Sequence, residues 1–252
     1  MSAKQEFLQS CEEGNLPKLK EICSSGDITS LWETKGKSSG LHLAASEGHL
    51  DVVRYLLTFH IDVNVIDRTG QTPLWAACQS GNEEIIKVLL QDPRVDVNHE
   101  DKKGATPFSI ACAQELKEIL KIFLRDPRFN VNKEDNFGQT PLWIACKNST
   151  FEIAEMLLRD ERVDVNRENR YGQTPLWIAC SNGNLKLVKL LFASGIRVDI
   201  KKRTNSSFLL NPHITAAEIA AEMGMDKIAA LVGAYEGSQK EVCSRLRKER
   251  GI

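Results

Sequence analysis

Thr72-Pro73-Leu74-Trp75-Ala76-Ala77-Cys78 is the segment that decides the fold, because the chain repeats it. Close copies begin at Thr106, Thr140 and Thr174, so the period is 34 residues. A fixed period of this size is typical of stacked-repeat proteins, in which each unit contacts only its neighbours. The sequence therefore predicts one elongated domain built from repeats.

Each repeat is expected to begin with two short helices. Thr72 is a good N-cap, and Pro73 suits the first helical position, where no backbone N–H is needed. Gly81 ends the first helix, and the apolar residues between 85 and 90 form the second, which ends at Asp92-Pro93. Helices this short cannot bury their apolar faces alone, so successive repeats must stack.

A hairpin-like finger is expected to join one repeat to the next. After the second helix, Val95-Asp96-Val97-Asn98 is extended and Asp101-Lys102-Lys103-Gly104 turns the chain back. These residues resemble ankyrin repeats, and the segment from Ser39 to Leu57, followed by Asp62-Val63-Asn64, agrees best with the family pattern. The resemblance implies an all-α solenoid of about seven stacked helix-turn-helix units with β-hairpin-like fingers.

Phasing the pattern outward predicts an ankyrin-repeat domain over residues 1–234. Its repeats are expected at 3–37, 38–71, 72–105, 106–139, 140–173, 174–213 and 214–234. Residues 235–252 are a charged tail, predicted to be helical over Lys240–Lys248. Its basic residues are interpreted as a solvated face, with contact to an acidic partner as the alternative.

Composition excludes several functions. The net charge is −1, so no global basic field attracts nucleic acid or membranes. No apolar run is long enough for a membrane span, and the start of the chain has no signal region, so we expect a cytoplasmic or nuclear monomer. Glycines fall on the repeat period and the histidines form no ligand-type cluster, so we expect no enzyme activity, no cofactor and no metal.

Four cysteines, Cys78, Cys112, Cys146 and Cys180, share one position of the repeat. Stacked helices lie about 8–10 Å apart, whereas sulfurs on one zinc are within about 4 Å of each other. We therefore interpret these cysteines as small buried residues.

Departures from the family pattern are where specific function is expected. Tryptophan replaces the family's histidine at 75, 143 and 177, either as packing between repeats or as an aromatic stripe on the concave face. Glu115 and Ser149 replace the glycine between the two helices, which predicts a distorted turn. Arg94, Arg128 and Arg162 should form a solvated row.

The sixth finger is about eight residues longer than the fifth. It places Lys201, Lys202 and Arg203 beside Phe208, Leu209 and Leu210. An apolar patch with a charged rim is a common contact surface, but the apolar residues could equally cover the last repeat.

The resemblance implies protein binding through the finger tips and first helices, which line a concave groove. The predicted partner-binding residues are Arg68, Thr69, Gln71, Gln79, Lys102, Lys103, Gln114, Asn136, Phe137, Lys147, Arg170, Tyr171, Lys201, Arg203 and Phe208. This set is basic and includes aromatics, whereas the second helices carry Glu83, Glu84, Glu152 and Glu155.

We therefore predict a non-catalytic adaptor, scaffold or inhibitor with an acidic protein or peptide partner. The alternative function is nucleic-acid binding by the basic finger tips.

Overall fold

The computed structural model describes residues 2–24, 38–205 and 213–251. Its regular elements in these ranges are α-helices, with no β-strand. None of the described helices is both long and apolar enough to cross a membrane. The chain divides into two compact units, Met1–Asn130 and Val131–Ile252. The all-α fold class predicted from the sequence is confirmed.

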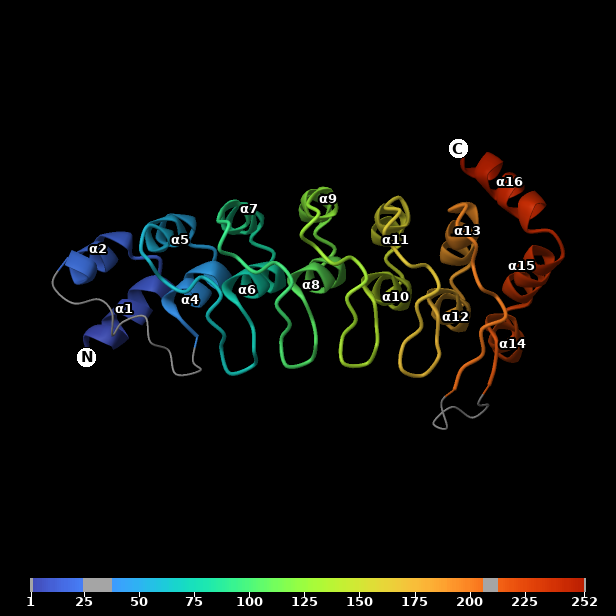
Figure 1. The fold of residues 1–252 in the computed structure, drawn as a ribbon, viewed down its shortest axis with the longest axis horizontal. Coiled ribbons are helices and arrows are strands. Elements are labelled where there is room, and N and C mark those ends of the chain that lie inside the picture. The colour runs from blue at the N-terminus through green and yellow to red at the C-terminus, as the bar shows by residue number, and fades with distance from the viewer. Residues whose placement is uncertain (1, 25–37, 206–212, 252) are drawn as a thin grey trace. The chain divides into compact units, whose positions relative to one another are not determined.

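The first unit is a stack of helix pairs (Figure 1). The first helices of its repeats pack side by side, as do the second helices. The helices are α1 (Ala3–Glu12), α2 (Leu16–Ser24), α4 (Gly40–Glu47), α5 (Leu50–Leu57), α6 (Pro73–Ser80), α7 (Glu83–Gln91), α8 (Pro107–Ala113) and α9 (Lys117–Arg125).

The second unit continues the same alternation and ends in an additional helix. Its helices are α10 (Pro141–Lys147), α11 (Phe151–Leu158), α12 (Pro175–Ser181), α13 (Leu185–Ala193), α14 (Ala216–Glu222), α15 (Asp226–Gly237) and α16 (Gln239–Arg250). The helix predicted in the charged tail is thus α16, which packs on α13 and α15.

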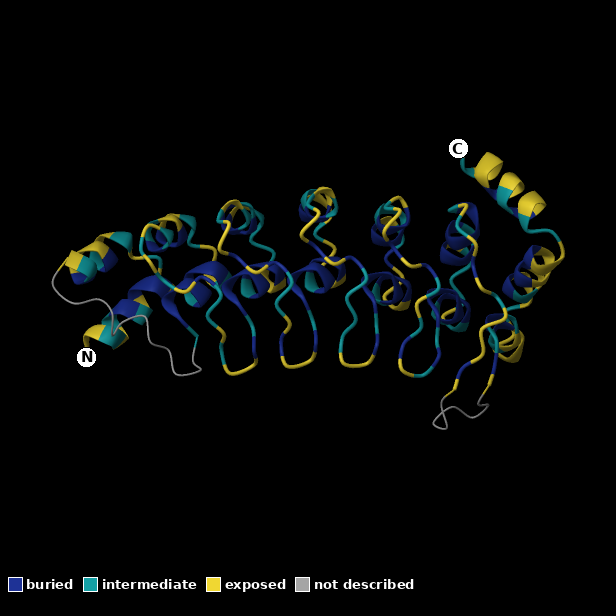
Figure 2. Cartoon of the chain, viewed as in Figure 1, coloured by how far each residue is buried: buried dark blue, intermediate teal, exposed yellow. Residues whose placement is uncertain are grey.

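The residues of the repeated motif are scaffold. Thr72, Thr106, Thr140 and Thr174 cap their helices by accepting a hydrogen bond from the residue three positions later. The four motif cysteines are at most 1% exposed, and all seven cysteines of the chain are free thiols. Burial raises the pKa of Cys146 to about 12. The interpretation of these cysteines as small buried residues is confirmed. Figure 2 shows buried residues along the helices and exposed residues at the finger tips.

The motif tryptophans also belong to the core. Trp75, Trp143 and Trp177 are 7%, 3% and 5% exposed. This decides for packing between repeats and against an exposed aromatic stripe.

The turn at Glu115 contradicts the predicted distortion. Glu115 has φ 56° and Gly81 has φ 74°, so both are left-handed. The hydrogen bonds match as well: Leu116 N–H donates to Ala111 O, as Asn82 N–H donates to Ala77 O, both at 3.0 Å. The fold therefore keeps the turn and tolerates the strain of a non-glycine residue.

The predicted row of solvated arginines is confirmed in its exposure, since Arg94, Arg128 and Arg162 are all exposed, and each also makes a specific contact. Each arginine chelates the aspartate two residues before it, for example Arg162 on Asp160, with Nη2 2.7 Å from Oδ2. Arg128 additionally donates to the carbonyl of Leu90 in the preceding repeat. These exposed arginines thus also brace the corner after each second helix.

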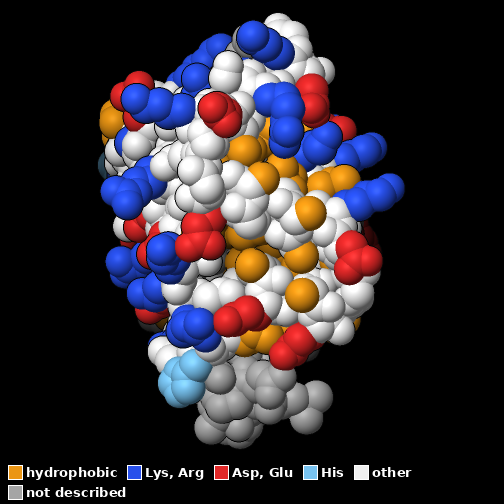
Figure 3. Space-filling model, turned by 90° about the vertical axis from the view of Figure 1, so that its right-hand side faces the viewer, with side chains coloured by type: hydrophobic (Ala, Val, Ile, Leu, Met, Phe, Trp, Pro, Cys, Tyr) orange, Lys and Arg blue, Asp and Glu red, His pale blue; other side chains and the backbone are white. Residues whose placement is uncertain are grey.

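The last helix pair presents an end face that differs from the buried faces of earlier repeats (Figure 3). Hydrophobic side chains lie in the middle of this face and charged ones around it. Glu218 of α14 stands where α12 has Trp177, and Ala221 stands where α12 has Cys180. At these two positions larger core residues are thus replaced by a charged and a small one. One large apolar side chain, Met223, is nevertheless 54% exposed.

Candidate protein-binding surface

Four of the described fingers turn at a side chain that caps the tip. Asp67 Oδ1 accepts hydrogen bonds from the backbone N–H groups of Thr69 (2.8 Å) and Gln71 (3.0 Å). Partial burial acts to raise the pKa of Asp67, but hydrogen bonds from Thr69 and Gln71 outweigh it and hold the pKa below its usual range. Asp101, Asp135 and Asn169 form the same turn.

Neighbouring finger tips are joined by backbone hydrogen bonds. In the first unit Lys102 N–H donates to Thr69 O at 2.9 Å, and in the second Arg170 N–H donates to Phe137 O at 2.9 Å. The approach is so close that a Cβ on Gly138 would lie 2.8 Å from Arg170 N. The tips therefore form rigid rows within each unit, not independent loops.

Asparagine side chains connect the fingers at their bases. Asn64 Nδ2 donates to Arg94 O at 2.7 Å, and its Oδ1 accepts from Asp96 N–H at 2.7 Å. Asn98 in the first unit and Asn166 in the second make the same pair of bonds. With both ends of each finger fixed, the exposed side chains are held in a regular array.

Most of the predicted site residues lie at the surface. Gln71 and Tyr171 are half-buried, and the exposed ones are Arg68, Thr69, Gln79, Lys102, Lys103, Gln114, Asn136, Phe137, Lys147, Arg170, Lys201 and Arg203. Thr69 and Lys102 lie side by side in the first unit, as do Phe137 and Arg170 in the second. Lys147 Nζ lies 5.6 Å from the centroid of the Trp143 ring.

The cations of the long sixth finger are engaged within the chain. Lys201 Nζ lies 3.1 Å from Glu236 Oε1, and Lys202 Nζ lies 2.9 Å from Glu168 Oε2. Arg203 Nη2 lies 3.1 Å from Glu218 Oε1. The predicted site residue Phe208, with Leu209 and Leu210, lies outside the described residues.

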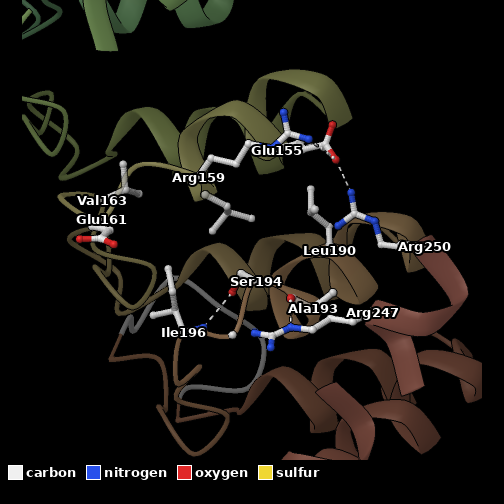
Figure 4. Close-up of a pocket in the computed structure, with 12 residues that line it drawn as sticks. Glu155, Arg159, Glu161, Val163, Leu190, Ala193, Ser194, Ile196, Arg247 and Arg250 are labelled. Atoms are coloured by element: carbon white, nitrogen blue, oxygen red, sulfur yellow. Dashed lines mark hydrogen bonds and ion pairs between the residues drawn. The ribbon is translucent and has the colours of Figure 1, made fainter. Parts of the chain in front are cut away.

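A groove of about 750 Å³ lies between α11, α13 and α16 (Figure 4). Arg250 of α16 forms an ion pair with Glu155 of α11 and lies over the ring of Phe151. Arg247 Nε donates to Ala193 O at 3.1 Å and so caps the last turn of α13. The interpretation of the tail's basic residues as a solvated face is wrong for Arg250, which is half-buried, whereas Arg247 stays exposed while it makes its hydrogen bond.

Asn169 is a residue that the sequence reasoning did not single out. It lies on the 34-residue period with Asp67, Asp101 and Asp135. The sequence alone therefore shows that an amide replaces a carboxylate at this position of the repeat. The effect of this replacement on binding depends on the neighbouring Arg170, whose backbone is hydrogen-bonded into the row of finger tips.

The family comparison covers nearly the whole chain. The family described as ankyrin repeats (3 copies) matches residues 7–101, 41–135, 90–169, 108–204 and 151–242. Among solved structures, the ankyrin repeat domain of Bcl-3, a member of the IkappaB protein family, superposes with a TM-score of 0.75 at 24% identity and covers 89% of this chain and 97% of that one. EF0377, an ankyrin repeat protein, gives 0.68 at 28% identity over 77% of this chain and 96% of that one.

Curated relatives match over shorter segments. A probable E3 ubiquitin-protein ligase, XBOS33 from Oryza sativa subsp. japonica, is 49% identical over 55 residues, 22% of this chain and 11% of the relative. Protein phosphatase 1 regulatory subunit 12A from Mus musculus is 34% identical over 73 residues, 29% of this chain and 7% of the relative. The matches thus cover about a tenth or less of these relatives' length.

Proposed function

The chain belongs to the ankyrin-repeat family, and we propose that it binds a protein partner through its finger tips and first helices. Ankyrin repeats generally mediate protein–protein interaction, and their fold is typically a non-catalytic module. The protein acts as an adaptor, a scaffold or an inhibitor through this surface and catalyses no reaction itself.

The observation that carries this proposal is the difference in burial between the motif residues and the finger-tip residues of each repeat. The residues that recur in every motif copy are buried caps and core, whereas the finger-tip residues differ from repeat to repeat and are mostly exposed on rigid tips. A preorganised array loses little conformational entropy on binding, which favours affinity. Lys201 and Arg203 have a smaller part in the proposed surface, because Glu236 and Glu218 already compensate their charge.

Charge supports an acidic partner. The proposed residues of the first unit include Arg68, Lys102 and Lys103 and no acid, while Glu83 and Glu84 lie on α7. Charge complementarity of this kind raises association rates and selects partners.

The binding surface is tested by site-specific photo-crosslinking in cell extract. A photoreactive amino acid is placed at the tip position Thr69 or Asn136, and in control proteins at Lys121 of α9 or Glu152 of α11. We expect the tip positions to give a protein adduct that excess unlabelled chain suppresses. Adducts from the control positions alone would overturn the proposal.

Nucleic-acid binding is the competing function, and its signature is electrostatic. With a net charge of −1, generic DNA or RNA should not bind appreciably. A mobility shift that weakens steeply as the salt concentration rises would favour the nucleic-acid alternative.

A further inference from the structure

Phe137 is an exposed aromatic residue on a rigid support. Its side chain is 51% exposed, and its backbone N–H donates to Asp135 Oδ1 at 2.8 Å. Its carbonyl accepts the hydrogen bond from Arg170 N–H. An aromatic side chain kept in water on a fixed backbone is a typical anchor for a partner, because burying it gains apolar contact at little entropic cost.

Arg170, the neighbour of Phe137 in the tip row, has no acidic partner among the described residues. The cations around it are paired: Arg167 with Glu134, and Lys202 with Glu168. All of them line a polar groove of about 470 Å³ beside the tips. Glu134 and Glu168 are thus compensated, and the third acid of the groove, Asp164, accepts the backbone N–H of Asn166 at 2.9 Å. Arg170 forms no ion pair with any of the three, so its charge is available to a ligand.

Asn169 strengthens the positive field at Arg170. Its Oδ1 accepts from Tyr171 N–H at 2.9 Å and from Gln173 N–H at 3.0 Å, the bonds that a carboxylate makes at Asp67 and Asp135. The turn is therefore preserved while one negative charge is removed. Because Asn169 is 4% exposed, a charge there would act on its neighbours with little screening by solvent.

We infer that Phe137 and Arg170 recognise an extended protein segment in which a bulky apolar side chain is adjacent to Asp or Glu. The apolar side chain packs on Phe137, and the carboxylate accepts hydrogen bonds from Arg170. Tyr171, the residue after Arg170, is half-buried. This inference rests on the proposed function and specifies its partner in the second unit.

The charge at position 169 provides the test. Asn169→Asp adds a carboxylate that the same turn already accommodates at Asp67 and Asp135, each followed four residues later by glutamine as Asn169 is. Asp135→Asn makes the opposite change one repeat earlier. The melting temperatures of both variants should stay close to that of the wild type, so binding differences will report charge.

The probe is an acidic heptapeptide with a central phenylalanine, titrated into the ¹⁵N-labelled full chain. We expect amide shifts at Phe137 and Arg170, affinity about 2–5-fold lower in Asn169→Asp, and unchanged or higher affinity in Asp135→Asn. Phe137→Ala should abolish the preference for phenylalanine over alanine in the peptide.

Three results would overturn the inference. They are equal binding of a lysine-substituted peptide, shifts confined to other surfaces, and stronger shifts at Arg170 with an oligothymidine than with the peptide. If one of these occurs while tip crosslinks to a protein persist, the partner chemistry fails and the proposed function stands. Loss of the tip crosslinks themselves would overturn both this inference and the proposed function.

Discussion

The imidazole Nε2 of His42 lies 2.8 Å from the backbone carbonyl oxygen of Gln71, 29 residues later. This contact links the first helix of the repeat, α4, to the end of its finger. On the other side of the ring, Nδ1 accepts a hydrogen bond from Ser39 N–H at 3.1 Å. Trp75, Trp143 and Trp177 occupy the equivalent position, and their buried indole N–H groups have no hydrogen-bond partner. Those repeats therefore exchange a hydrogen-bonded link for apolar packing.

Replacing His42 or Trp143 with phenylalanine should show how much the hydrogen-bonded link and the apolar packing each contribute to the free energy of unfolding. His42→Phe leaves the buried Ser39 N–H without a partner and removes one of the two hydrogen bonds to Gln71 O, which keeps the bond from Asp67 N–H. It should lower the free energy of unfolding by about 1–3 kcal/mol. Trp143→Phe removes apolar area but also an unsatisfied donor, so its cost should stay within about 1 kcal/mol. Urea unfolding measures both, and an equal cost would show that the histidine link contributes nothing.

His42 also predicts a pH dependence. Burial lowers the pKa of His42 below the ordinary value of about 6.5. The unfolded chain then binds the proton first, so stability from this group is full above about pH 6.5 and declines as the pH falls through the folded pKa. Unfolding measured between pH 5 and pH 8 should show this decline in the wild type. The slope should be smaller in His42→Phe, and an identical slope would contradict the assignment.

Glu115 and Gly81 occupy the same left-handed position of two repeats, so exchanging residue types at these positions measures the strain of a side chain there. Glu115→Gly should raise the free energy of unfolding by about 0.5–1 kcal/mol, because relief of the left-handed strain exceeds the entropic cost of glycine. Gly81→Ala should cost about 1–2 kcal/mol from conformation alone. Space is not limiting at Gly81, since the added Cβ would lie 3.5 Å from Leu116 Cδ2. Thermal or urea unfolding tests both signs, and a destabilising Glu115→Gly would refute the strain.

Gly138 tests the rigidity of the tip row. Gly138→Ala adds a Cβ 2.8 Å from Arg170 N and should break the bond to Phe137 O, so exchange of the Arg170 amide hydrogen should accelerate at least tenfold. Gly224 has a similar φ of +70° and nothing within 4 Å of an added Cβ. Gly224→Ala should therefore leave that exchange rate unchanged. Equal rates in the wild type and Gly138→Ala would mean that the tips are not coupled.

Much of the fold could be predicted from local pattern. Thr72 before Pro73 specifies a helix start whatever surrounds it, and the 34-residue period specifies stacking. The exposure of Phe137 and Arg170 followed from the same phasing. Glu115 shows the limit: local preference opposed a left-handed residue, but the packing of the neighbouring helices outweighed about 1–2 kcal/mol of strain.

The sequence by itself determined the repeat, its caps and its core, because each depends on contacts within a few residues or on a pattern that recurs in every copy. Only the tertiary structure decided which charges remain available. Lys202 meets Glu168 from the neighbouring finger, and Arg250 meets Glu155 from a helix 95 residues earlier. Arg170 meets no such acid among the described residues. Ion pairing depends on distances between side chains of different repeats, and the identity of a residue in a periodic sequence does not fix those distances.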